Sequence, residues 1–114
     1  MTNLNILREN IYQLTQMLEK ISDFDFDIFK FDEICENNSL YYYTFELFGK
    51  YEFFSNINEE VFNRFINMIK DGYPRKNSYH NDLHATDVLQ TCVTIFEKGN
   101  FIQVNLLIFL FISY

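Results

Sequence analysis

Apolar positions recur at helical spacing along most of the chain. In residues 3–22 they repeat at alternating intervals of three and four positions, which is typical of a contact between two helices. This stripe, called the N-terminal seam below, comprises Leu4, Leu7, Ile11, Leu14, Leu18 and Ile21. Two interpretations stay open, because such a helix can lie on the core of its own domain or form a homodimer contact.

The next segment, residues 23–36, begins with alternating Asp and Phe, a period of two that is typical of a strand. We predict a helix instead, because the alternation is short and the apolar residues that follow fit one helical face. These are Ile28, Phe29, Phe31, Ile34 and Cys35. Residues 37–39 are predicted to form a loop and N-cap, and residues 40–49 an aromatic helix that Gly49 stops.

A further helix is predicted to begin at Asn56, with Glu59 three positions later in a capping-box-like arrangement. It should end near Asp71 and Gly72, where a loop containing Pro74 begins. One apolar stripe marks its predicted core face: Val61, Phe62, Phe65, Ile66 and Ile69.

The last clear helix is predicted from near Ser78 to Lys98, with Gly99 just beyond its end. Its predicted core face comprises Ala85, Val88, Leu89, Cys92, Ile95 and Phe96. Because the chain has only one Pro and three Gly, an all-α fold is favoured over a turn-rich β fold.

Composition narrows the possible partners and the compartment. The chain has 114 residues, the size of one small domain, and a net charge of −7, which argues against binding to a nucleic acid polymer. Cys35 and Cys92 form no metal-binding pair and are expected to be free thiols in the core. With no secretory signal and no apolar run long enough for a membrane span, we predict a cytoplasmic protein.

Both histidines of the chain, His80 and His84, lie four positions apart. On a helix that starts near Ser78 they would share a polar face with Asp87, beside the apolar face. Imidazoles can bind metal ions or transfer protons near neutral pH. By spacing alone the pair could equally be two surface histidines, since Asn81 stands where H-E-x-x-H metalloproteases carry Glu.

The residues around these histidines resemble the first signature motif of the class I cyclic-nucleotide phosphodiesterases. The matching stretch reads Tyr79-His80-Asn81-x-x-His84-Ala85-x-Asp87-Val88-x-Gln90. The resemblance extends over residues 23–98, and it implies the N-terminal helical portion of a larger multi-helix catalytic domain that acts in signal transduction. The expected substrates are the cyclic nucleotides cAMP and cGMP.

The resemblance also implies roles for individual residues. His80 would be the general acid that protonates the departing 3′ oxygen, and His84 a ligand of a tightly held metal, usually zinc. A second metal, usually magnesium (or manganese), would share a bridging hydroxide that attacks the phosphorus and yields the 5′-monophosphate. Asn81 and Asp87 also match motif positions and are expected to support the site.

The chain departs from the family after the motif. The His-Asp pair and the further metal-binding Asp that the family carries downstream do not follow, and residues 106–112 are uniformly apolar. The expectation is a helix in residues 1–22, a partial catalytic domain in 23–98 and a truncated or divergent tail in 99–114, which together lack activity. Two alternatives remain: a non-catalytic helical interaction module derived from a phosphodiesterase, and an unrelated helical domain with incidental histidines.

Overall fold

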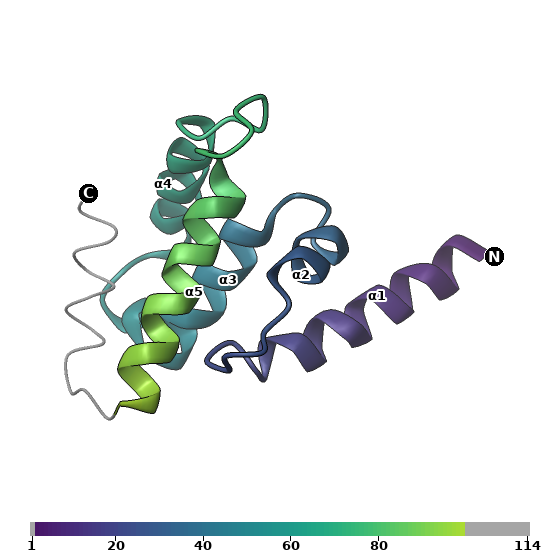
Figure 1. The fold of residues 1–114 in the computed structure, drawn as a ribbon, viewed down its shortest axis with the longest axis horizontal. Helices are drawn as coiled ribbons and strands as arrows, with labels where there is room; N and C mark the ends of the chain where they lie inside the picture. The colour runs from purple at the N-terminus through teal and green to yellow at the C-terminus, as the bar shows by residue number, and fades with distance from the viewer. Residues whose placement is uncertain (1, 100–114) are drawn as a thin grey trace.

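The computed structural model describes residues 2–99, and of their side chains those of residues 8–99. Five α-helices and one short 3₁₀ helix follow one another without a strand in this part of the chain (Figure 1). They are α1 (Thr2–Leu18), α2 (Ile28–Ile34), α3 (Ser39–Lys50), η1 (Phe53–Ser55), α4 (Glu59–Asp71) and α5 (Asp82–Lys98). The all-α prediction is confirmed. None of these helices is both long enough and apolar enough to cross a bilayer.

Helix α3 is the centre of the packing, since it contacts α2, η1, α4 and α5. The buried core around it is rich in aromatic rings that meet edge-on or tilted, such as Phe31 against Tyr43 and Phe48 against Phe62. Helix α1 extends away from the other helices toward the N-terminus (Figure 1). Its last turns pack on the core through Leu14, Met17 and Leu18.

The predicted helix over residues 3–22 ends earlier, at Leu18. Two turns follow it, with hydrogen bonds from Lys20 N to the Met17 carbonyl (2.9 Å) and from Asp23 N to the Lys20 carbonyl (3.2 Å). Ile21, the last residue of the N-terminal seam, is therefore in a turn and is buried in the core. The side chains of Leu4 and Leu7, and the predicted tail after Gly99, lie outside the described residues.

The helical interpretation of residues 23–36 is confirmed for Ile28–Ile34. The alternating Asp and Phe residues precede α2, and Asp27 caps it by accepting a hydrogen bond from Lys30 N at 3.0 Å. Gly49 does not stop α3 as predicted, because it has ordinary helical geometry and the helix continues to Lys50. The chain instead reverses at Glu52, which has a φ of 61°.

Two predicted helix starts were wrong. Helix α4 begins at Glu59, with Asn58 instead of Asn56 as its cap, and the Asn58 side chain accepts from Glu60 N at 2.7 Å. Helix α5 begins at Asp82, with Asn81 as its cap, and not near Ser78. In both cases a later Asn takes the cap position because its side-chain oxygen reaches a free backbone N–H of the first turn.

The predicted core face of α5 was wrong at Val88 and Ile95, whereas Leu89 is buried in the core and Phe96 packs against it as expected. Val88 and Ile95 are 40% and 47% exposed, although both were expected to be buried. The face that packs on α2 and α3 instead carries polar residues among the apolar ones: Asp82, Thr86, Leu89, Gln90, Val93 and Thr94. Four polar side chains can be buried here because each has hydrogen-bond partners within the fold. Of the two free thiols, Cys35 is buried as expected and Cys92 is half-buried.

Candidate functional site

The two histidines lie side by side at the start of α5. His84 is in the first turn of the helix and half-buried, whereas His80 precedes the Asn81 cap and is exposed. Their ring centroids are 6.1 Å apart. The predicted proximity is present, but the shared helical face is not its cause, since His80 belongs to the loop between α4 and α5.

Tyr79 completes a cluster of three rings. Its ring centroid lies 5.0 Å from that of His80 and 4.3 Å from that of His84, and its plane is tilted by 36° to the His84 ring. Tyr79 is itself 62% exposed, so the cluster faces solvent. Tyr79 belongs to the sequence motif, and its ring contacts both imidazoles.

Asn81 organises the backbone that carries both histidines. Its side-chain oxygen accepts a hydrogen bond from His84 N at 3.1 Å, and its side-chain nitrogen donates to the Asn77 carbonyl at 3.0 Å. Asn77 in turn donates to the His80 carbonyl at 3.2 Å. Asn81 therefore caps α5 and also stabilises the loop before it.

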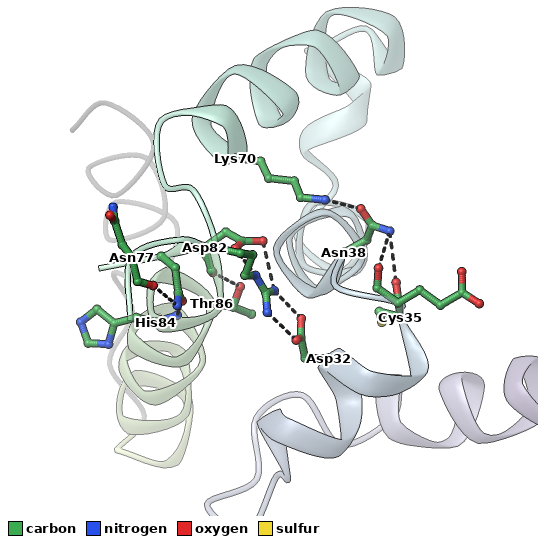
Figure 2. A network of polar contacts seen from close by, with 11 residues as sticks. Asp32, Cys35, Asn38, Lys70, Asn77, Asp82, His84 and Thr86 are labelled. Carbon is green, nitrogen blue, oxygen red and sulfur yellow. Dashed lines mark hydrogen bonds and ion pairs between the residues drawn. The ribbon is translucent and has the colours of Figure 1, made fainter. Parts of the chain in front are cut away.

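Arg75, Asp32 and Asp82 form a charged cluster at this loop that the sequence pattern did not predict. Arg75 donates to both oxygens of Asp32 on α2 (2.7 and 2.8 Å) and to both oxygens of Asp82 on α5 (2.5 and 3.2 Å). Figure 2 shows the hydrogen bonds made by the Asp32 and Asp82 carboxylates, with the His84 ring pointing away from them. The signal for it was Asp32 itself, at a core position of an amphipathic helix where a carboxylate needs a partner.

The cluster shifts the pKa values of Asp32 and Arg75. Burial by itself raises the pKa of Asp32, but the hydrogen bonds and positive charge of Arg75, together with polar contacts of Ser39, outweigh burial and hold this pKa below its ordinary value. The pKa of Arg75 is raised, chiefly because its guanidinium donates to Asp32. Asp32 and Arg75 are therefore both charged near neutral pH, and their attraction acts between α2 and the loop that carries His80.

The remaining motif residues differ in their surroundings. Gln90 is buried, and its side-chain nitrogen donates to the backbone carbonyls of Ile21 and Asp23, which makes it a structural anchor. Asp87 is exposed one turn beyond His84, and its side chain has no hydrogen bond or ion pair within residues 8–99. Across the same residues, no group of three His, Cys, Asp or Glu side chains is arranged to hold a metal ion.

Several curated proteins are similar to this chain in sequence. The 3′,5′-cyclic-AMP phosphodiesterase 4 of Dictyostelium discoideum is 36% identical over 85 residues, which cover 73% of this chain and 8% of that protein. Two Drosophila melanogaster proteins each match 68% of the chain. They are the high affinity cAMP-specific and IBMX-insensitive 3′,5′-cyclic phosphodiesterase 8 (37% identical, 9% of its length) and the dual specificity calcium/calmodulin-dependent 3′,5′-cyclic nucleotide phosphodiesterase 1 (33%, 10% of its length).

The chain thus spans about a tenth of the length of these relatives. No family model matches it, and no solved structure does.

Proposed function

The chain belongs to the 3′,5′-cyclic-nucleotide phosphodiesterase family, and on that premise we propose that it contributes the general acid of a cyclic-nucleotide phosphodiesterase. The observation that carries the proposal is the adjacency of His80 and His84, whose rings lie 6.1 Å apart on an exposed surface. The reaction would open the 3′,5′-cyclic phosphate of cAMP or cGMP and leave the 5′-monophosphate.

His80 is proposed to protonate the departing 3′ oxygen. An imidazolium is suited to this step, because it is the side chain whose proton is most readily given up near neutral pH. The exposure of His80 supports the role, since the ring can meet a substrate and regain its proton from solvent. No hydrogen bond from the rest of residues 8–99 reaches either of its ring nitrogens, so both are free to meet a ligand.

His84 is proposed as one ligand of a divalent metal, zinc beside magnesium or manganese, with Asn81 and Asp87 in support. Residues 8–99 do not fit such a centre by themselves, because they bring no three ligands together and a catalytic zinc site takes about three from the protein. The 114-residue chain alone is proposed to be inactive.

A chimaera tests the proposed activity. Residues 2–99 would replace the matching segment of the Dictyostelium relative, so that the remaining residues of that enzyme stand around His80 and His84. Hydrolysis of cyclic AMP to the 5′-monophosphate is expected, whereas the isolated chain with zinc and magnesium should give none. A folded, metal-loaded chimaera without hydrolysis would contradict the proposed activity. Hydrolysis by the isolated chain would contradict the proposal that its site is incomplete.

A second candidate is a helical interaction module. The observation that favours it is the exposure of Ile11 and Tyr12, at 55% and 59%, on the part of α1 that extends from the other helices (Figure 1). The C-terminal half of the N-terminal seam is not available for a partner, however, because Leu14 and Leu18 pack on the core and Ile21 is buried in it. A homodimer contact would therefore be restricted to the N-terminal half of the seam.

A further inference from the structure

Arg75 binds two carboxylates from different helices with one guanidinium. The two forks use Nη1 and Nη2 toward Asp32 and Nε and Nη2 toward Asp82. A planar guanidinium that makes two forked contacts has its orientation fixed, because each fork restricts rotation about the other. A lysine could supply the charge here but not this geometry.

The contacts join elements that are distant in the sequence. Asp32 belongs to α2 and is 6% exposed, whereas Asp82 is the first residue of α5 and is fully buried. Asp82 N also donates to the Tyr73 carbonyl at 3.1 Å. The two ends of the loop formed by residues 73–82 are therefore tied to each other and to α2.

Tyr79, His80 and Asn81 lie inside this closed loop. Within it, the hydrogen bonds of Asn77 and Asn81 fix the backbone on either side of His80. Since no side chain among residues 8–99 holds the imidazole nitrogens, the place of the His80 ring depends on the loop backbone and on its packing against Tyr79. The loop in turn depends on its attachment through Arg75.

We propose that Arg75 is a positioning residue, which sets the separation of His80 and His84 by fastening the loop that carries His80 to α2 and to the first turn of α5. This inference rests on the proposed function only for the roles given to the two histidines. Arg75 itself would touch neither substrate nor metal, because its guanidinium is engaged by Asp32 and Asp82. Figure 2 shows these two carboxylates on the side away from the His84 ring.

The test is an NMR comparison of ring contacts in the full chain. Proton–proton contacts of the Tyr79 ring with the rings of His80 and His84 would be recorded for the unaltered chain, Arg75→Met and Arg75→Lys. We expect both variants to lose the Tyr79–His80 or the Tyr79–His84 contact while Phe31–Tyr43 contacts in the core persist. Lys76→Met is the matched control, since this exposed cation of the same loop makes no ion pair within residues 8–99, and it should keep every contact.

A further variant separates positioning from stability. Arg75→Met combined with Asp32→Asn and Asp82→Asn leaves no buried carboxylate uncompensated, so thermal stability should recover, yet the ring contacts should stay lost. Unchanged ring contacts in any folded Arg75 variant would overturn the proposal. Unfolding of all three Arg75 variants where Lys76→Met is folded would also overturn it, by making Arg75 a general stabiliser. Because no turnover is measured, this outcome is independent of the hydrolysis assay.

Discussion

The side-chain amide of Gln90 donates a hydrogen bond of 2.8 Å to the backbone carbonyl of Asp23, which joins α5 to the turns that follow α1. The same nitrogen lies 3.3 Å from the Ile21 carbonyl and 2.9 Å from Thr94 Oγ1. One amide thus donates to two backbone carbonyls of this connection, and the Ile21 carbonyl also accepts a hydrogen bond from the Tyr43 hydroxyl at 2.8 Å. This gives a motif position a purpose that is separate from chemistry.

Gln90→Leu should destabilise the chain by about 0.5–1.5 kcal/mol, because the Asp23 and Ile21 carbonyls lose the bonds from this amide and keep only those from Phe26 N and the Tyr43 hydroxyl. Urea unfolding followed by circular dichroism would measure the loss. Thr91→Ala, at an exposed neighbouring position of α5, is the control and should change the free energy of unfolding little. A Gln90→Leu variant as stable as the unaltered chain would contradict the anchoring role.

Replacement of Asp32 should make the free energy of unfolding less dependent on pH in the acid range. Asp32→Asn leaves the Arg75 fork incomplete. We expect its cost at neutral pH to be below the roughly 3–5 kcal/mol of a fully buried pair, because 32% of the Arg75 side chain is exposed to solvent.

The sign of the pH dependence follows from the lowered pKa of Asp32. Because this pKa lies below the ordinary 3.8, the ionised carboxylate stabilises the fold above about that pH, and this contribution is lost as the pH falls through the lower folded value. The difference between Asp32→Asn and the unaltered chain should therefore be constant at neutral pH and shrink in acid. Asp25→Asn, an exposed carboxylate outside any ion pair of residues 8–99, is the control. A difference that persists at acid pH would contradict the assignment.

The local sequence pattern predicted where the helices lie along the chain better than it predicted which of their residues are buried. The positions of α2, α3 and α4 could be predicted because apolar residues recur at helical spacing there. The core face of α5 could not, because the pattern assumes that buried residues are apolar. Thr86 and Thr94 are buried with hydroxyls that donate to the carbonyls one turn earlier, at 2.8 and 2.7 Å. Asp82 is buried against Arg75, whose second partner lies on another helix.

The candidate site could be predicted only in part, because local spacing shows which residues are neighbours along a helix but not which distant residues contact them. His80 and His84 were expected to be neighbours, and their rings are. The reason was wrong, since a cap at Asn81 begins the helix after His80. Local spacing could not disclose that Asn77 and Arg75 shape this loop, because the contacts of Arg75 with Asp32 join residues that are distant in the sequence.

His80 and His84 should have separable roles in the chimaera with the Dictyostelium relative. His80→Ala should lower turnover of cyclic AMP by about 10²–10⁴-fold, the range of general acid catalysis, and leave the bound metal in place. His84→Ala should lower turnover and zinc content together. Steady-state kinetics combined with metal analysis of the purified variants would test this. Equal loss of metal in the two variants would contradict the assignment.

A dimer contact through α1, if it forms, should depend on Ile11. This side chain is 55% exposed and lies on the N-terminal half of the seam, whereas Leu18 packs on the core of its own chain. Ile11→Glu should therefore shift the sedimentation coefficient of a dimeric chain to that of a monomer without unfolding it, because a charge is placed in an apolar contact. Gln16→Glu, at an exposed polar position on the opposite face of α1 from the seam, is the control and should leave the assembly unchanged. A chain that sediments as a monomer over a wide concentration range before any substitution would contradict the interaction module and leave α1 as a helix that serves its own domain.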